Sequence, residues 1–479
     1  MSLIKSALKG MFWTFIQQMS TQGISFIVSI ILARILLPSE FGLIALLGIF
    51  VAIGDVLINS GLSQSLIRTT NPDNDDFYTV FYFNLLMSIV MYFLIYFIAP
   101  FVTQFYSQPL LTNIMRIYCL SFIISSFSLV QYTLLAKAMD FKKQTMINIP
   151  SVVVSSIVGI TMAFNGFGVW SLVWSALTGS ALKSIQLWFW SSWRPSFRFN
   201  KEKIKQHLNF GYKLTLSGII DTLFKDIYTI IIGKFFDPLQ VGFYNRANTL
   251  QMYPINNFST VLNTVTFPLF SKIQDDNIKL KNAYKKIMQI SVFLIAPTLL
   301  TMSALAEPLF RFILTEKWLP AVPYFQILCF TGIFYPINAY NLNIISVKGR
   351  SDLYLILSVV KKVLIILVIL ISFQWGIYGL LFGQIPLSII AIFFNGYYTG
   401  KLINYGVLEQ FKHIIPTIFY SLICGSLVYF FDTYIAISYT DLFRLLFGVL
   451  ISVFCYLLLS FFLNKPILLD LISIVKPKK

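Results

Sequence analysis

Residues 33–43 read ARILLPSEFGL, and residues 233–243 read GKFFDPLQVGF. In both phrases a cation is followed by a proline and then by a glycine at the same spacing, and each phrase lies between two long apolar stretches. A second pair of similar phrases, GVWSL at 168–172 and GIYGL at 376–380, lies at nearly the same offset. The two matches predict a chain of two related halves, which is the usual plan of a transporter with its substrate path between the halves.

The composition is typical of a membrane protein, with 57% apolar and only 11% charged residues. A helix needs about 20 apolar residues to cross a hydrocarbon layer roughly 30 Å thick, and we find about 14 such stretches. We therefore predict an all-α integral membrane protein with two pseudo-symmetric six-helix lobes and a terminal helix pair. The expected spans are 10–33, 42–66, 78–100, 112–135, 146–164, 168–190, 213–235, 248–270, 286–306, 322–346, 353–373, 376–398, 414–431 and 443–463.

The longest polar interruption, residues 191–212, is expected to separate the two lobes as a cytoplasmic, amphipathic segment at the membrane interface. Within it, Ile204 and Leu208 share one helical face, and Lys201, Lys205 and His207 are expected to face water and lipid headgroups. The predicted domains are a first lobe (1–190), this linker (191–212), a second lobe (213–400), and a terminal helix pair with a basic cytoplasmic tail (401–479).

The net charge of +17 is distributed in a way that indicates membrane topology. With a cytoplasmic N-terminus, about 25 Lys and Arg residues fall on the cytoplasmic side and about 7 on the other side. This bias predicts that both termini are cytoplasmic. Basic loops of this kind contact anionic membrane lipids, and we expect no nucleic-acid partner.

The motifs of membrane enzymes and primary pumps are absent from the sequence. No GxxxxGK[ST] loop occurs, and the two histidines, His207 and His413, are expected in solvated cytoplasmic loops. The NPDNDD segment at 71–76 is similar in composition to a diphosphate–metal motif, but turn formation explains it better. We predict no catalytic residue, no metal site and no cofactor.

Polar side chains recur within the expected spans, where each must face another helix or water. They are candidates for a hydrated cavity or for ion coupling, and hydrogen bonding between helices is the alternative. Asp221 and Lys225 are one turn apart and can pair, which would make them part of a coupling site or simply a self-neutralised pair. The candidates are Gln17, Thr21, Asp55, Asn59, Asp221, Asp226, Asn256 and Asn257.

Five cations lie within or beside the expected spans. Arginine and lysine bind phosphate through charge-assisted hydrogen bonds, so these residues are candidates for a cationic substrate cavity. The alternative is that their long side chains reach the membrane surface. The candidates are Arg34, Lys183, Lys225, Arg246 and Lys361.

Several motifs of this chain resemble those of one family. The opening hairpin contains ILARILLPSEFGLIAL (31–46) and GLSQSLIR (61–68), and the second half contains VGFYNRANTLQMYP (241–254), FPLFSKIQDD (267–276) and WLPAVPYFQIL (318–328). These segments resemble the Wzx-like polysaccharide flippases of lipopolysaccharide and capsule biosynthesis, within the multidrug/oligosaccharidyl-lipid/polysaccharide (MOP) exporter superfamily. The resemblance covers essentially the whole chain.

The resemblance implies two six-helix bundles around a central cavity, two added helices, and a location in the bacterial inner membrane. It implies a flippase that moves an undecaprenyl-diphosphate-linked oligosaccharide to the outer leaflet by alternating access, with the polysaccharide polymerase and chain-length machinery as protein partners. The alternatives are a cation-coupled multidrug exporter of the same superfamily, a peptidoglycan-precursor flippase, a membrane glycosyltransferase or polymerase, and a nontransporting scaffold. The motifs do not specify the glycan.

Overall fold

The computed structural model describes residues 3–59, 61–463 and 465–468, and within these ranges the chain forms helices and no strand. The predicted all-α fold is therefore confirmed. The chain divides into two compact units, residues 1–242 and 243–479. The predicted basic tail at the C-terminus lies mainly outside the described residues.

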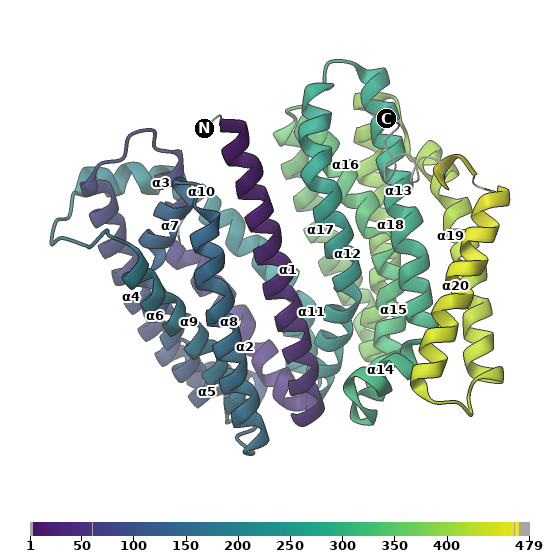
Figure 1. The fold of residues 1–479 in the computed structure, drawn as a ribbon, viewed down its shortest axis with the longest axis horizontal. Helices are drawn as coiled ribbons and strands as arrows, with labels where there is room; N and C mark the ends of the chain where they lie inside the picture. Colours follow the sequence, from purple (N-terminus) through teal and green to yellow (C-terminus); the bar gives the residue numbers. More distant parts are fainter. Residues whose placement is uncertain (1–2, 60, 464, 469–479) are drawn as a thin grey trace. The chain divides into compact units, whose positions relative to one another are not determined.

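The first unit is a bundle in which α8 packs against both α1 and α9, while α4 packs against α5 and α6 (Figure 1). Its helices are α1 (Leu3–Ile35), α2 (Pro38–Asn59), α3 (Leu62–Arg68), α4 (Asn74–Tyr106), α5 (Leu111–Tyr118), α6 (Leu120–Ser126), α7 (Leu129–Lys137), α8 (Phe141–Phe164), α9 (Val169–Trp190), α10 (Lys201–Lys225), α11 (Ile227–Phe235) and the first turn of α12 (Pro238–Lys272).

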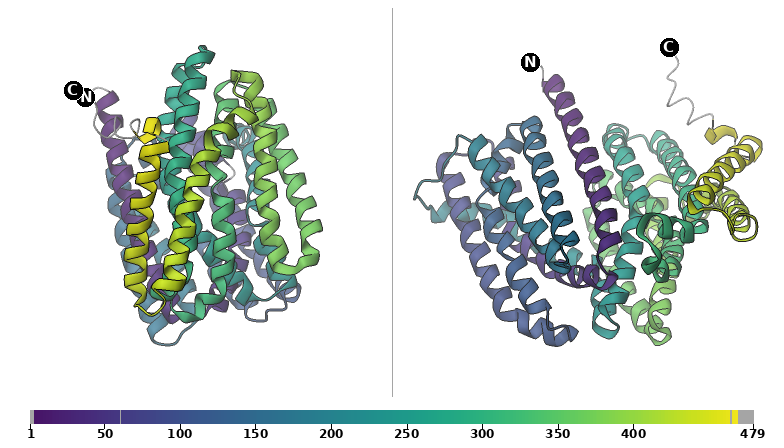
Figure 2. Two further views of the ribbon diagram at one scale, coloured as in Figure 1. Left: turned by 90° about the vertical axis from the view of Figure 1, so that its right-hand side faces the viewer. Right: turned by 60° about the horizontal axis from the view of Figure 1, so that its bottom comes forward.

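The second unit contains the rest of α12 and a bundle centred on α13, which packs against α15 and α19. Figure 2 shows α19 beside α20, the last long helix. The elements are α13 (Asn277–Ala304), α14 (Ala306–Leu314), η1 (Glu316–Ala321), α15 (Val322–Gly332), α16 (Tyr335–Val347), α17 (Ser351–Ser372), η2 (Phe373–Trp375), α18 (Gly376–Ile403), α19 (Val407–Phe430), η3 (Phe431–Ile435) and α20 (Asp441–Leu463).

Nine helical stretches of the described chain are long and apolar enough to cross a membrane, or ten if the bent pair Leu111–Ser126 and Leu129–Lys137 is one span. This makes the chain a multi-pass membrane protein, but the expected count of fourteen is not confirmed. Three expected spans, 168–190, 213–235 and 248–270, are helical without being among the nine. Their sequences explain this: α9 and α12 carry many polar side chains, and the helix breaks at Asp226 between α10 and α11.

The segment 191–212 differs from the expectation in two respects. Residues 191–200 are irregular, and α10 then runs without interruption from Lys201 through residue 213, so the expected domain boundary falls inside a helix. His207 is buried, contrary to the prediction of a solvated residue, whereas Lys201 and Lys205 are exposed as predicted. Ile204 and Leu208 pack on Leu62, Phe77 and other residues of α3 and α4. The apolar face of α10 thus packs on protein. His207 lies beside this face and is buried with it.

The two repeated phrases of the sequence meet in the first unit. A Cβ added to Gly42 would lie 1.8 Å from the carbonyl oxygen of Pro238, and one added to Gly242 would lie 2.0 Å from the carbonyl oxygen of Pro38. The first turns of α2 and α12 therefore approach each other reciprocally, backbone against backbone. Only glycine leaves room for this contact, which explains why it recurs at the same place in both phrases.

The α19–α20 corner of the second unit contains a buried ion pair. Arg444 Nε and Nη2 donate hydrogen bonds to Asp432 Oδ1 and Oδ2 at 2.7 and 2.8 Å, and both side chains are at most 5% exposed. Because the pair is bidentate and buried, each side chain neutralises a charge that would otherwise be buried without a partner.

We predict that Gly42→Ala lowers the free energy of unfolding by roughly 1–3 kcal/mol, since the new methyl group forces the backbones apart. Gly48→Ala on the same helix is the matched control, because no atom lies within 4 Å of its added Cβ. Unfolding of the purified protein in detergent, followed by tryptophan fluorescence, measures both changes. Equal effects of the two substitutions would contradict the close backbone contact.

Arg444→Met is expected to cost about 3–5 kcal/mol because it leaves the Asp432 carboxylate buried without its partner. The exposed pair Arg350–Asp352 has a similar bidentate geometry, with distances of 2.9 and 2.7 Å, so Arg350→Met provides the comparison and is expected to cost about 0–1 kcal/mol. The same unfolding measurement applies. A loss for Arg444→Met as small as that for Arg350→Met would show that the buried pair is not required.

Candidate functional site

A cavity of about 800 Å³, with both apolar and polar side chains in its wall, lies inside the first unit. Helices α2, α3, α6, α7, α8 and α9 all contribute to its wall, so the bundle around it is formed entirely from residues 59–183. The side chains in the wall are mostly small and hydroxylated. The polar lining residues are Asn59, Ser63, Ser125, Ser128, Tyr132, Thr133, Asn148, Ser151, Ser155, Ser175, Ser180 and Lys183.

The serines of α8 and α9 result from a close approach of these two helices. A Cβ on Gly159 would lie 2.9 Å from the Ser175 Cβ, and a Cβ on Gly179 would lie 3.3 Å from the Ser155 Cβ. Ser175 Oγ donates a hydrogen bond to the Ser155 carbonyl oxygen at 2.8 Å. Small residues therefore allow the two backbones to pack tightly, while their hydroxyl groups supply hydrogen-bonding capacity at the cavity wall.

Two lining serines also accept hydrogen bonds from side chains of α9 that are not in the lining. Ser184 Oγ donates to Ser128 Oγ at 2.9 Å, which joins α9 to the beginning of α7. Gln186 Nε2 donates to Ser151 Oγ at 2.8 Å, which joins α9 to α8. Ser128 and Ser151 donate their own protons to the carbonyl oxygens of Ser125 and Ile147, at 3.0 and 2.9 Å. Toward a ligand, these two hydroxyl groups can therefore act only as acceptors.

Lys183 is the one cation among the residues that line this cavity, and no Asp or Glu occurs among them. Its Nζ lies 4.2 Å from the centre of the Tyr132 ring, in the arrangement of a cation–π contact. The side chain is only partly exposed. Because an ionisable group within a membrane protein is costly, a positive charge retained here favours an anionic group in the cavity.

The structure brings two of the predicted site residues, Asn59 and Lys183, together in this cavity. Asp55 is one turn before Asn59 on α2 and is exposed, and its carbonyl oxygen accepts a 2.8 Å hydrogen bond from Asn59 Nδ2. Gln17 and Thr21 of α1 are not among the lining residues. Gln17 Oε1 accepts from Thr145 Oγ1 of α8 at 3.4 Å, and Thr21 bonds back to the Gln17 carbonyl. These two contacts fit the alternative of hydrogen bonding within and between helices.

The remaining candidates of the first unit lie away from the cavity lining. Arg34 is exposed in the last turn of α1. Asp221 and Lys225 are exposed on α10, and Asp221 Oδ2 accepts a hydrogen bond from Ser217 at 3.4 Å. Asp226 occupies the break between α10 and α11. A pair between Asp221 and Lys225 stays a prediction.

The second unit contains the other four candidates. Arg246 on α12 is buried, and its guanidinium carbon lies 5.2 Å from the centre of the Trp318 ring. Asn256 and Asn257 are exposed on the same helix, and Lys361 is exposed on α17. No cavity lining described in this unit includes them.

Sequence reasoning missed most of the cavity wall. Ser151 and Ser155, and likewise Ser175, Gly179 and Lys183, recur at four-residue steps on α8 and α9. This spacing places small polar residues on one helical face and was the available signal.

The cavity can bind a hydroxyl-rich ligand with a negative charge, but the described residues provide little for catalysis. No group of three or more His, Cys, Asp and Glu side chains in the described ranges could hold a metal ion. His413, expected in a loop, lies in α19, with Nδ1 2.9 Å from the Tyr405 hydroxyl, and it is not among the cavity residues.

Comparisons with known proteins agree with a role in polysaccharide transport. The chain is 25% identical to the lipopolysaccharide biosynthesis protein WzxC of Escherichia coli K12, over 81% of this chain and 80% of that protein. It is 23% identical to the succinoglycan biosynthesis transport protein ExoT of Rhizobium meliloti, over 70% and 68% of the two chains. It is 22% identical to the teichuronic acid biosynthesis protein TuaB of Bacillus subtilis, over 74% and 73%.

Solved structures of the MOP superfamily share the fold. The lipid II flippase MurJ in an inward closed conformation matches with a TM-score of 0.77 and 15% identity, over 96% of this chain and 100% of that one. An inward-facing multidrug transporter of the MATE family matches with a TM-score of 0.60 and 16% identity, over 82% and 98%. Residues 31–323 match the family model described as polysaccharide biosynthesis protein, and the chain therefore belongs to this family.

Proposed function

We propose that this protein is a flippase that moves an undecaprenyl-diphosphate-linked oligosaccharide from the cytoplasmic to the outer leaflet of the bacterial inner membrane. The observation that carries the proposal is the hydroxyl-lined cavity with its single lysine, inside a multi-pass protein of the polysaccharide biosynthesis family. The relatives named for lipopolysaccharide, succinoglycan and teichuronic acid biosynthesis support a surface glycan as the cargo.

The chemistry of the cavity suits such a cargo. A sugar that leaves water loses hydrogen bonds, and the serine, threonine and asparagine side chains of the wall can replace them. Lys183 can balance one negative charge of the substrate, either on the diphosphate or on an acidic sugar. The polyprenyl chain needs no such site because it remains in the hydrocarbon of the bilayer while the head group crosses by alternating access.

The other predicted residues take secondary places in this proposal. Arg34, Lys225, Arg246 and Lys361 remain candidate contacts for the diphosphate. Asp55, Asp221 and Asp226 remain candidates for coupling to an ion or a proton, since intramembrane acids commonly serve this purpose. The cytoplasmic excess of basic residues supports cytoplasmic termini, and the polysaccharide polymerase and chain-length machinery are the protein partners we propose.

Three alternatives are less well supported. A cation-coupled multidrug exporter is expected to have acidic residues in its first-lobe cavity, but Asp and Glu do not occur in this lining. A peptidoglycan-precursor flippase has the same fold as this chain, but the relatives matched in sequence are named for other surface glycans. A glycosyltransferase requires catalytic groups, and the cavity supplies none of a recognisable kind.

The proposed function predicts the phenotype of a gene deletion. Complete lipid-linked repeat units should accumulate on the cytoplasmic face of the membrane, and surface glycan should be lost, while the cells continue to grow. The measurement is quantification of lipid-linked glycan by leaflet together with surface glycan. Normal surface glycan in a strain without a second copy would reject the proposal, and loss of viability would favour the peptidoglycan alternative.

Lys183→Gln tests the role of the cavity charge. Glycan export should fall about tenfold, as expected when a hydrogen bond to a charged group is lost, and Lys183→Arg should retain most of the export. Lys142→Gln, which removes an exposed lysine of α8, is the control and should have no effect. Export is measured as surface glycan per cell at equal protein level. Equal export by the Lys183→Gln and Lys142→Gln variants would show that Lys183 does not act on the substrate.

A further inference from the structure

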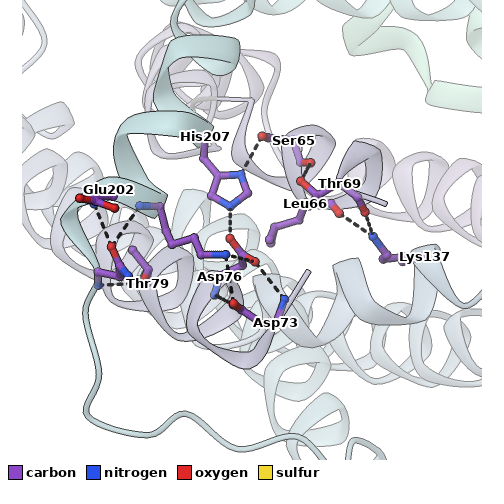
Figure 3. Close-up of polar contacts among 11 residues, drawn as sticks. Ser65, Leu66, Thr69, Asp73, Asp76, Thr79, Lys137, Glu202 and His207 are labelled. Carbon is purple, nitrogen blue, oxygen red and sulfur yellow. Dashed lines mark hydrogen bonds and ion pairs between the residues drawn. The ribbon is translucent and has the colours of Figure 1, made fainter. Parts of the chain in front are cut away.

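A buried polar network joins α10 to α3 and α4 at one end of the first unit (Figure 3). His207 of α10 is 4% exposed, and its ring lies between two partners. Nδ1 is 2.7 Å from Ser65 Oγ of α3, and Nε2 is 3.1 Å from Asp76 Oδ1 of α4. An ionised carboxylate only accepts hydrogen bonds, so Nε2 carries the proton, and Nδ1 of a neutral ring accepts from the serine hydroxyl.

Asp76 is also held from its other side. Lys203, one turn before His207, places Nζ 3.1 Å from Asp76 Oδ2 and 3.0 Å from Asp73 Oδ2. Asp73 and Asp76 form a reciprocal capping box at the beginning of α4, with both bonds at 2.9 Å. The NPDNDD segment is thus a helix start, as its turn-forming residues indicate, but its last aspartate is buried and bonded to α10.

The α3 helix connects this network to the cavity. Ser65 belongs to the network, whereas Ser63 and Ile67 of the same short helix line the cavity. Lys137 of α7 donates hydrogen bonds to the carbonyl oxygens of Leu66, at 2.9 Å, and Thr69 at the end of α3. One face of α3 is therefore bonded to α10, and another forms cavity wall.

The residue directly before α3 also lies close to α10. Gly61, directly before α3, has a φ of 66°, which favours glycine. A Cβ at this position would lie 2.9 Å from the Gly211 Cα of α10. The helix α10 thus contacts α3 through His207 and the residue directly before α3 through Gly211.

We infer that His207 and Asp76 are positioning residues for transport, which hold the cavity-lining helix α3 on α10. In chain order α10 leads through α11 and α12 into the second unit. A displacement of α10 would be passed to α3 through this network. The inference deepens the proposed function and rests on it for the role of the cavity.

The ionic part of the network keeps its charges around neutral pH. The pKa of Asp73 is lowered, first by the hydrogen bond from the Asp76 backbone N–H and then by Lys203, and the pKa of Lys203 is raised by Asp73 and Asp76. The stabilisation from Asp73 is present above its unfolded pKa and is lost as pH falls through its lower folded value. The stabilisation from Lys203 is lost only as pH rises through its raised pKa. We therefore expect this ion pair to hold α10 on the start of α4 throughout the range around neutral pH, and not to act as a pH switch.

Hydrogen exchange of the purified protein in nanodiscs, together with export in cells, tests the inference. In His207→Ala, amide exchange in residues 62–68 and 201–212 should become about tenfold faster, because a buried hydrogen-bonded group has lost its partners. Exchange in α8 and α9 should stay unchanged, and export should fall at equal protein level. His207→Gln keeps a donor and an acceptor and should restore part of both. Lys205→Ala, on the exposed side of α10, is the control.

Ser65→Ala provides a milder variant if His207→Ala does not accumulate, and it should accelerate exchange in residues 62–68 alone. Unchanged exchange in residues 62–68 in both variants would overturn the inference, and so would normal export despite faster exchange there. A uniform rise in exchange throughout the first unit would show a merely structural role and would also overturn it. Failure of the proposed function is distinguishable, because the gene deletion itself would then leave surface glycan normal.

Discussion

A polar side chain within a membrane must bond to another polar group or to water, and this constraint shapes the first unit. Serines of α8 satisfy it through backbone carbonyl oxygens of their own helix, and Ser175 of α9 satisfies it through the Ser155 carbonyl oxygen of α8. The same small residues allow the two helices to approach closely and place hydroxyl groups on the cavity wall. Lys183 is the one cation among the lining residues, and acidic side chains are absent from the lining.

A second constraint, on backbone packing, applies at Gly42 and Gly242. Here the first turns of α2 and α12 meet so closely that neither position accepts a side chain. The contact is reciprocal, as expected for two copies of one ancestral motif. The repeated phrases that predict a duplication in the sequence are therefore also the residues that bring the two helix starts together.

The sequence predicted the helical membrane fold well, because an apolar stretch long enough to cross a bilayer indicates a membrane-spanning helix. The family was also predictable, since its motifs extend along the chain. The count of fourteen spans is not confirmed, because α9 and α12 carry polar residues that lower their mean hydropathy and because the expected spans 353–373 and 376–398 lie in one continuous stretch, Ser351–Ile403. The sites were hardest to predict. Lys183 and Asn59 were named, but the serines beside them look ordinary in sequence, and only the packing of several helices gathers them. His207 was expected in water because its neighbours are basic, and its burial follows from Ile204 and Leu208 packing on α3 and α4.

The account depends most on the claim that the glycan occupies the cavity of the first unit, and photo-crosslinking tests this directly. A photoreactive amino acid would replace Ser180 in the cavity wall or, as a control, the exposed Lys142 of α8. After irradiation of intact cells, the purified protein would be examined by mass spectrometry for a covalently attached lipid-linked glycan. The account predicts an adduct at position 180 and none at position 142. An adduct at neither position, from cells in which the protein exports glycan normally, would contradict it.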